Sequence, residues 1–199
     1  TEYYHDQVGA TQSIVERFRQ EMYPRADVCF GYSEAAGEWF RGRGAPDNRI
    51  VTGKQVVPAS LLPKDPGSQP GTDTTTICSL GSLEKRKGVP RLIKAFQHLD
   101  PINGRLSIAG DGPLRSAVEK LSSGDDRITI HGHVSEEMKA SLLAAADIFV
   151  LPTLHDPWGL VVNEALHYGT PVVVTDMAAS SELIRETGAG AILPDATVS

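Results

Sequence analysis

Short runs of branched apolar residues alternate with amphipathic stretches along most of this chain, and this alternation constrains its fold more than any other feature. Six runs are typical of β-strands and occupy residues 27–32, 75–80, 105–109, 127–131, 147–151 and 171–175. Between the later runs, stretches such as GLVVNEALHYG repeat apolar residues at i, i+3 and i+4, which predicts helices packed on a sheet. Apolar strands joined by crossover helices predict an α/β fold with a doubly wound parallel sheet, covered on both faces.

Residues 61–74 (LLPKDPGSQPGTDT) interrupt this alternation with three prolines, two glycines and no periodic apolar pattern. We therefore expect a linker at 61–74 between an N-terminal segment, residues 1–60, and an α/β domain at 75–199.

The N-terminal segment predicts helices at 8–22 and 33–43, one strand, and an extended piece at 49–57. Ser33 is the expected N-cap of the second helix and Gly44 its stop. One good strand is too few for a complete α/β domain, so we expect this segment to be the tail of one.

Composition and charge exclude several classes of protein. An apolar fraction of 40% and a charged fraction of 22% are those of a globular protein, not of a disordered or fibrous one. The formal net charge of −6 repels nucleic acid, so no nucleic-acid partner is expected and any bound phosphate needs a local site. Cys29 and Cys78 lie in apolar runs without a Cys-x-x-Cys pair, which predicts buried thiols in a reducing, cytoplasmic compartment.

The given residues predict neither a membrane span nor a leader. No run approaches the ~18 apolar residues needed for a membrane span, and the start, TEYYHDQVGA, has neither the basic nor the apolar region of a leader. The first residue is not Met, as expected if the chain is processed or is a piece of a longer protein.

The sharpest candidate site is DPWGLVVNEALHYGTPVVVTD, residues 156–176. Asp156 follows a predicted strand, and a proline and a glycine predict a tight turn before a helix that starts at Gly159 or Leu160. The N-terminus of that helix is expected at the carboxyl edge of the sheet, where its free N–H groups suit a phosphate or a sugar hydroxyl. With Glu164 one turn into the helix, two carboxylates could hold two sets of hydroxyls. Taken singly, Asp156 is better explained as a helix cap and Glu164 as a solvated charge, but the pair at this spacing favours a binding site.

The residues of this segment, with others in order along the chain, resemble a known family. The pattern acid-x-(Phe/Trp)-Gly-Leu-x-x-x-Glu-Ala-x-x-x-Gly-x-Pro-Val is similar to the donor-site signature of retaining nucleotide-sugar glycosyltransferases of family four, which have the two-domain, Rossmann-like GT-B fold. Here the pattern is Asp156, Trp158, Gly159, Leu160, Glu164, Ala165, Gly169, Pro171 and Val172. Further segments that resemble the family are residues 32–46, 79–96, 106–115 and 128–153.

The resemblance implies a role for each matched position. Glu164 would hold the ribose hydroxyls of the donor nucleotide, and Asp156 stands where the family has a Glu that contacts the donor sugar. The N–H groups of Gly159, Leu160 and Val161 would face the sugar and diphosphate, where fixed dipoles stabilise the leaving group. The resemblance also includes Trp158 in the donor site.

The loop after the strand at 75–80 would supply a positively charged side chain for the diphosphate. Lys87 matches the family lysine that neutralises the diphosphate, although the basic run KRK is also compatible with a solvated charge. The family pattern Gly-Arg-Leu is Gly81-Ser82-Leu83 here, so the second diphosphate cation is missing from position 82. Arg86 is the candidate substitute.

Two glycines and one histidine complete the candidate site. Gly110 and Gly112, in GDGPLR, are expected to let the backbone approach the nucleotide, with Pro113 in the first helical turn; a purely structural turn is the alternative. His155 is a candidate donor contact or has no role. His131 and His133 lack a third ligand, so no metal is expected.

The sequence therefore predicts the donor-binding domain of a retaining, nucleoside-diphosphate-sugar-dependent glycosyltransferase, in which Asp156, Glu164 and Lys87 carry the chemistry. Its partners would be the nucleotide sugar, a sugar, lipid or small-molecule acceptor, and the missing N-terminal domain; no cofactor is expected. Relative to the family, the chain is expected to be short at both ends, and peripheral membrane attachment of the full-length enzyme stays open. The alternatives are a non-catalytic nucleotide-sugar-binding module or inactive fragment, and another enzyme class such as an epimerase or phosphorylase.

Overall fold

The computed structural model describes residues 10–64, 66, 74–99 and 103–194. The chain divides into two compact units, Thr1–Lys54 and Gln55–Ser199. Each unit is described by itself below.

The N-terminal unit is built on a two-stranded parallel sheet. Its elements are α1 (Ala10–Met22), the short 3-10 helix η2 (Tyr23–Arg25), β1 (Cys29–Gly31), α2 (Glu34–Arg41), the 3-10 helix η3 (Asp47–Arg49) and β2 (Ile50–Thr52). Cys29 pairs with Ile50 and Gly31 with Thr52. The strand expected at 27–32 is thus confirmed in a shorter form, and the extended piece at 49–57 contains a second strand.

The two helices of this unit begin and end close to their predicted positions. The predicted N-cap is confirmed, because Ser33 Oγ accepts a hydrogen bond from the N–H of Ala36 at 3.1 Å. α2 ends at Arg41, two residues earlier than expected, and the turn that follows contains Gly44 at a φ of 85°. Residues 8 and 9 of the first predicted helix lie outside the described residues.

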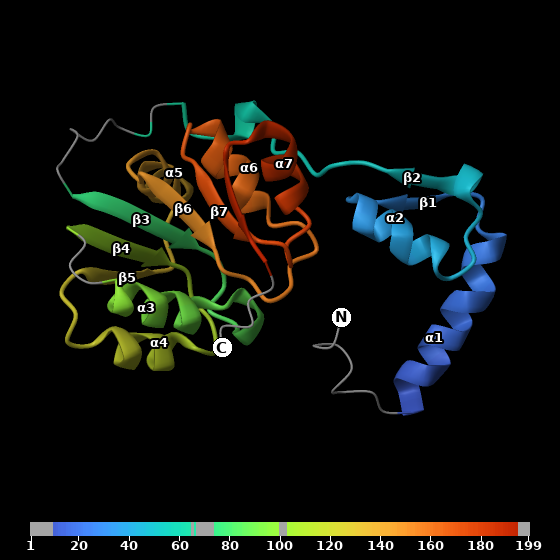
Figure 1. Ribbon diagram of the computed structural model, residues 1–199, viewed down its shortest axis with the longest axis horizontal. Coiled ribbons are helices and arrows are strands. Elements are labelled where there is room, and N and C mark those ends of the chain that lie inside the picture. The colour runs from blue at the N-terminus through green and yellow to red at the C-terminus, as the bar shows by residue number, and fades with distance from the viewer. Residues whose placement is uncertain (1–9, 65, 67–73, 100–102, 195–199) are drawn as a thin grey trace. The chain divides into compact units, whose positions relative to one another are not determined.

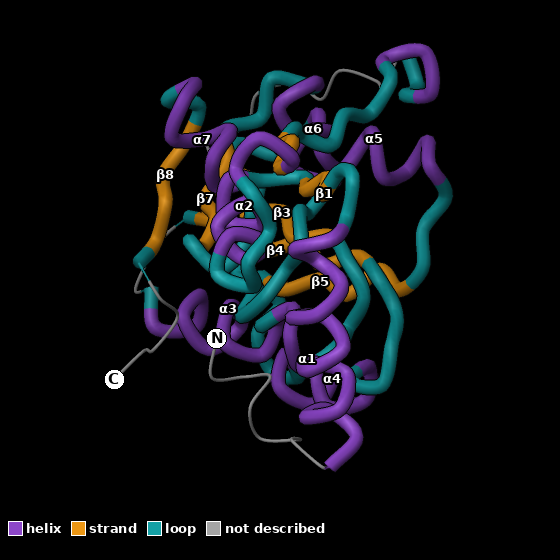
Figure 2. The backbone as a smooth tube through the Cα atoms, turned by 90° about the vertical axis from the view of Figure 1, so that its right-hand side faces the viewer, coloured by secondary structure: helices purple, strands orange, loops and turns teal. Residues whose placement is uncertain are grey.

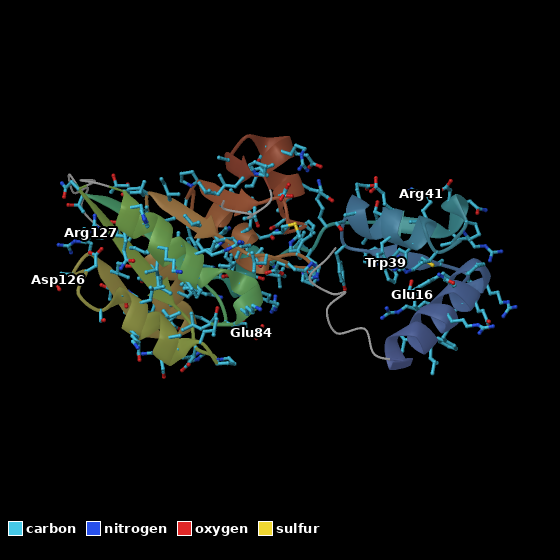
Figure 3. The ribbon with its side chains drawn as sticks, turned by 60° about the horizontal axis from the view of Figure 1, so that its bottom comes forward. Glu16, Trp39, Arg41, Glu84, Asp126 and Arg127 are labelled. Carbon is cyan, nitrogen blue, oxygen red and sulfur yellow. The ribbon has the colours of Figure 1, made fainter. Side chains whose placement is uncertain are left out.

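Aromatic and charged side chains hold α1 against α2 (Figure 3). The guanidinium of Arg43 lies 3.7 Å from the ring centroid of Trp39, and its Nε lies 2.6 Å from Glu16 Oε1. Tyr23 packs edge-on to Trp39 with their centroids 5.4 Å apart.

The C-terminal unit contains a six-stranded parallel sheet in the order β5-β4-β3-β6-β7-β8. The strands are β3 (Thr75–Leu80), β4 (Gly104–Ala109), β5 (Ile128–Gly132), β6 (Ile148–Leu151), β7 (Val172–Thr175) and β8 (Gly190–Leu193). The helices are α3 (Val89–His98), α4 (Arg115–Ser122), α5 (Glu136–Ala144), α6 (Leu160–His167) and α7 (Ser181–Thr187), with 3-10 helices η4 (Ala59–Leu61) and η5 (Lys85–Lys87).

Helices cover both faces of this sheet, as predicted. Figure 1 shows α3 and α4 on one face and α5, α6 and α7 on the other. The core accordingly has two clusters: Ile93, Phe96 and Val118 belong to the first, and Leu143, Val162 and Ile184 to the second. The strand order reverses direction between β3 and β6, which is the position where doubly wound sheets bind their ligands.

All five strands expected in this unit are present, each within one residue of its predicted start and end. The sixth, β8, was not predicted. It has four residues, three of them exposed, and lies at the sheet edge beside β7 (Figure 2). An exposed edge strand needs no long apolar run, so the only local sign of β8 is Ala-Ile-Leu after Gly190.

Three residues that precede β3, Gln55, Pro63 and Pro66, contact the helices of the C-terminal unit. Asn163 Nδ2 donates to the carbonyl of Gln55 at 3.0 Å, and the Tyr168 hydroxyl donates to that of Pro63 at 3.1 Å. Ser141 Oγ donates to the carbonyl of Pro66 at 2.7 Å. Residues 65 and 67–73 of the predicted linker lie outside the described residues. No helix in the described ranges is long and apolar enough to cross a membrane.

Candidate donor site

A buried ion pair joins the two loops that leave the sheet at the reversal point. Lys87 follows β3 and Asp156 follows β6, and Lys87 Nζ lies 2.5 Å from Asp156 Oδ2. Their side chains are only 14% and 8% exposed. Because β3 and β6 are adjacent and parallel, their carboxyl ends bring together two residues that are 69 positions apart.

Backbone contacts fix the loop that carries Lys87. Gly88 has a φ of 69°, and a Cβ there would lie 1.9 Å from the carbonyl oxygen of Pro152, so only glycine lets the two loops approach so closely. The carbonyl of Arg86 accepts hydrogen bonds from the N–H of Leu154 at 2.7 Å and from Thr153 Oγ1 at 2.8 Å. Contacts at Arg86 and at Gly88, on either side of Lys87, therefore hold the β3 loop against the β6 loop.

The loop that carries Asp156 is fixed as firmly. The N–H of Asp156 donates to the carbonyl of Met177 at 3.1 Å, and its Oδ1 accepts from the N–H of Trp158 at 3.3 Å. Gly159 has a φ of 89°, and a Cβ there would lie 2.8 Å from Leu151 Cδ2. The predicted tight turn is thus present, and α6 begins at Leu160 as expected.

Trp158 is a packing residue in this structure. It is 2% exposed, and its Nε1 donates to Asn163 Oδ1 at 2.8 Å. The indole does not reach the open side of the site, so any contribution of Trp158 to ligand binding acts through the placement of Asp156.

The N-terminus of α6 presents the expected group of amides. Gly159, Leu160 and Val161 lie at its start, where an α-helix cannot satisfy its own N–H groups. The aligned peptide dipoles give this end a partial positive charge, and Asp156, the partner of Lys87, lies three residues before Gly159. The geometry thus provides two positive features at one edge of the sheet.

Glu164 lies further along α6 and is buried against α5. Its side chain is 12% exposed, and its Oε2 lies 2.9 Å from the ammonium of Lys139. That ammonium also lies 2.6 Å from Glu136 Oε2. Burial lowers the pKa of Lys139, but hydrogen bonds to Glu136 and Glu164 outweigh it, and the net pKa is raised. No pattern in the sequence pointed to Lys139, because α5 and α6 meet only in the folded chain.

The sequence also lacks the family arginine at position 82, and the structure brings another arginine near. Arg86 Nη1 lies 4.0 Å from Asp156 Oδ2, and its Nε donates to Glu84 Oε2 at 2.8 Å. Ser82 is partly exposed in the same loop. A second cation is therefore present at the edge of the candidate site.

The three candidate glycines lie where the β3 and β4 loops touch. A Cβ on Gly110 would lie 1.8 Å from the carbonyl oxygen of Gly81, and one on Gly112 would lie 2.9 Å from the N atom of Leu83. These close approaches are to protein backbone, which supports the structural-turn alternative. The expectation for Pro113 was wrong: α4 begins at Arg115, so Pro113 lies in the turn before it.

The histidines differ in their surroundings. Burial lowers the pKa of His155, with Asp156 acting in the opposite direction and Arg86 adding to the decrease. This lowered pKa favours the neutral imidazole at neutral pH. Within the described ranges no three His, Cys, Asp or Glu residues form a group that could hold a metal ion.

The fold and this site define a doubly wound α/β domain with a buried lysine–aspartate pair at its strand reversal. Residues 74–199 match the family Glycosyl transferases group 1, and the chain belongs to that family. It is 33% identical over 117 residues to an uncharacterized glycosyltransferase of Methanocaldococcus jannaschii, covering 57% of this chain and 30% of that protein. It is 38% identical over 107 residues to a GDP-mannose-dependent alpha-(1-6)-phosphatidylinositol dimannoside mannosyltransferase of Mycobacterium tuberculosis, covering 52% and 28%. The chain thus spans about a third of the length of these curated relatives.

Solved structures share the fold at lower sequence identity. The Anabaena Alr3699/HepE structure in complex with UDP superposes with a TM-score of 0.74 at 19% identity, over 90% of this chain and 53% of that one. Sucrose-phosphate synthase from Thermosynechococcus elongatus superposes with a TM-score of 0.76 at 22% identity, over 95% and 50%. The predicted α/β fold class and its assignment to the GT-B type are confirmed.

Proposed function

We propose that this chain carries the donor site of a glycosyltransferase that moves a sugar from a nucleoside-diphosphate sugar to an acceptor with retention of anomeric configuration. The observation that carries the proposal is the Lys87–Asp156 pair, which spans the strand reversal beside the N-terminus of α6. Names of similar proteins support it, since one relative is GDP-mannose-dependent and one solved structure holds UDP.

Lys87 would bind the diphosphate. An ammonium has three donor hydrogens, so Lys87 can keep one on Asp156 and direct the others to phosphate oxygens. The amides of Gly159, Leu160 and Val161 would add fixed dipoles where negative charge develops on the leaving diphosphate. Because these groups supply the positive charge, no metal or other cofactor enters the proposal.

The two carboxylates would hold hydroxyl groups. Glu164 would accept hydrogen bonds from the ribose, and Asp156 from the donor sugar while it orients Lys87. Gly81, Ser82, Gly110, Gly112 and His155 belong to the surrounding loops. Arg86, near Asp156, is the proposed replacement for the arginine missing at position 82.

The N-terminal unit would be the last part of an acceptor domain. In this proposal residues 1–60 belong to that domain, 61–74 form the linker, and 75–199 bind the donor. The acceptor, whether sugar, lipid or small molecule, would be held by that domain, which would also mediate any peripheral membrane attachment. Cys29 and Cys78 are both buried free thiols, which supports a cytoplasmic location.

A thermal-shift panel tests the donor site. UDP, GDP, ADP, dTDP and NAD are added to the chain, to Lys87→Ala, and to Lys94→Ala, which removes an exposed lysine on the other face of the sheet. A ligand at 100 times its dissociation constant adds about 2.7 kcal/mol of stability. We expect one nucleoside diphosphate to stabilise the chain and Lys94→Ala but not Lys87→Ala. No shift with any of the five ligands would contradict the proposal.

The second candidate is a non-catalytic nucleotide-sugar-binding module, which the serine at position 82 favours. Comparison of the chain with Ser82→Arg, using the nucleotide sugar of the base found in the panel, separates the two. Transfer or hydrolysis by either protein, when an acceptor domain is supplied, supports the enzyme. Binding without turnover by both supports the module.

A further inference from the structure

Lys139 is the feature of this site that the family motif does not explain. Its ammonium contacts two carboxylates at once, Glu136 on its own helix at 2.6 Å and Glu164 on α6 at 2.9 Å. The Lys139 side chain is 21% exposed, the Glu136 side chain 66% and the Glu164 side chain 12%. Lys139 therefore links a solvated carboxylate to a buried one.

The buried carboxylate of Glu164 requires a counter-charge such as the Lys139 ammonium. A charged group taken out of water is costly unless a counter-charge and hydrogen bonds compensate for the lost hydration. Glu164 Oε2 is fully buried and is the oxygen that faces Lys139. This contact leaves Oε1 as the oxygen that can accept hydrogen bonds from a ligand.

The position of Lys139 also limits how Glu164 can turn. Lys139 lies in the first turn and a half of α5, and Glu164 is the fifth residue of α6. Both helices cover the same face of the sheet (Figure 1). Lys139 is itself only 21% exposed, so rotamers of Glu164 that keep Oε2 near this ammonium are favoured over those that separate the two charges.

We infer that Lys139 is a positioning residue, which orients the Glu164 carboxylate so that Oε1 meets the ribose hydroxyls of the donor nucleotide. This inference rests on the proposed function, in which Glu164 holds the ribose. It assigns Lys139 no direct contact with the ligand. Loss of Lys139 should therefore weaken binding only of ligands that carry the ribose hydroxyls. A general role of Lys139 in folding would weaken binding of ligands with and without these hydroxyls alike.

The test compares ligands with and without those hydroxyls. Dissociation constants of UDP and GDP, and of their 2′,3′-dideoxy counterparts, are measured by calorimetry for the chain and for Lys139→Met. We expect Lys139→Met to weaken binding of the hydroxyl-bearing nucleotide about tenfold, which corresponds to ~1.4 kcal/mol. Binding of the dideoxy nucleotide should be unchanged. Lys139→Arg should restore most of the affinity, and Lys94→Met should have no effect.

Glu164→Gln separates failure of this inference from failure of the proposed function. If wild type does not bind either nucleotide, or if Glu164→Gln binds both forms as wild type does, the proposed ribose contact is overturned. If Glu164→Gln selectively weakens the hydroxyl-bearing form and Lys139→Met does not, only the role of Lys139 is overturned. Equal weakening of both forms by Lys139→Met also overturns that role.

Thermal unfolding without ligand shows whether each variant is folded. Should Lys139→Met fail to fold, Glu136→Gln provides the same test, because it removes the second anchor of Lys139 at an exposed position. A threefold loss limited to the hydroxyl-bearing nucleotide would support the inference. No difference between the two ligand forms would contradict it.

Discussion

Both units pair their strands in parallel, but the two sheets differ in how much of their apolar surface is exposed to solvent. In the N-terminal unit, alternate residues of the β1 segment and one of β2 keep large apolar side chains in solvent: Val28, Phe30, Tyr32 and Val51. In the C-terminal unit, Leu106, Phe149 and Val172 on three strands are 0% exposed, because helices cover both faces.

This difference matters because parallel sheets normally occur with both faces covered. A two-stranded sheet with an open apolar face contributes little stability by itself. We therefore expect the C-terminal unit to hold most of the stability of this chain, and the site with it.

The largest effect on the free energy of unfolding is expected when one phenylalanine from each sheet is replaced and the two losses are compared. Phe149→Ala should lower the free energy of unfolding by about 3–5 kcal/mol, because it leaves a cavity in a closed core. Phe30 is 54% exposed, so Phe30→Ala should cost less than about 1 kcal/mol. Urea unfolding followed by circular dichroism measures both. A cost for Phe30→Ala as large as that for Phe149→Ala would break the comparison, since it would mean that the β1 face is covered in solution.

An intermediate effect compares one ion pair from each unit. Lys87→Met leaves the Asp156 carboxylate buried without its ammonium and should cost about 2 kcal/mol, below the range for fully buried pairs. Arg41 pairs with Asp47 on the surface (Figure 3), with side chains 51% and 77% exposed, so Arg41→Met should cause no measurable change. Thermal unfolding of both variants checks this. Equal losses would show that burial does not distinguish the two pairs.

The smallest expected effect concerns pH. Five of the six histidines of the chain lie in the C-terminal unit, so acidification between pH 7 and pH 5 reports mainly on that unit. The pKa of folded His155 is lowered from its ordinary value of 6.5, mainly by burial. The unfolded chain then binds this proton more readily, and the stability contributed by neutral His155 is lost as the pH falls through that range.

His155→Gln should therefore make stability less dependent on pH. The difference between variant and wild type at pH 8, where the imidazole is neutral in both states, gives the packing cost alone. We expect that difference to shift in favour of the variant at pH 5, as measured by urea unfolding at each pH. A difference that is constant from pH 8 to pH 5 would refute this assignment.

Much of the fold was predictable because buried strands have a recognisable local sequence pattern. Buried strands such as β6 and β7 need apolar residues at nearly every position, and their bounds were predicted to within one residue. β8 was missed because an edge strand with exposed side chains needs no such run. Pro113 was misplaced because a proline before a helix and one inside its first turn have the same local pattern.

The candidate site was only partly predictable. Asp156, Glu164 and Lys87 could be named from the family motif, and their expected surroundings at the start of α6 and after β3 are present. Their roles in binding stay predictions until the nucleotide panel is measured. Trp158 belongs to the same motif, yet its burial and its bond to Asn163 followed from no local pattern.

The sequence by itself determined the order and kind of the elements, because apolar periodicity and turn residues act over a few positions. Only the tertiary structure decided which charges meet. Lys87 reaches Asp156 because β3 and β6 are neighbours in the sheet, and Lys139 reaches Glu164 because α5 and α6 cover the same face. An ion pair depends on distance in space, and the reversal of strand order brings together groups that are far apart along the chain.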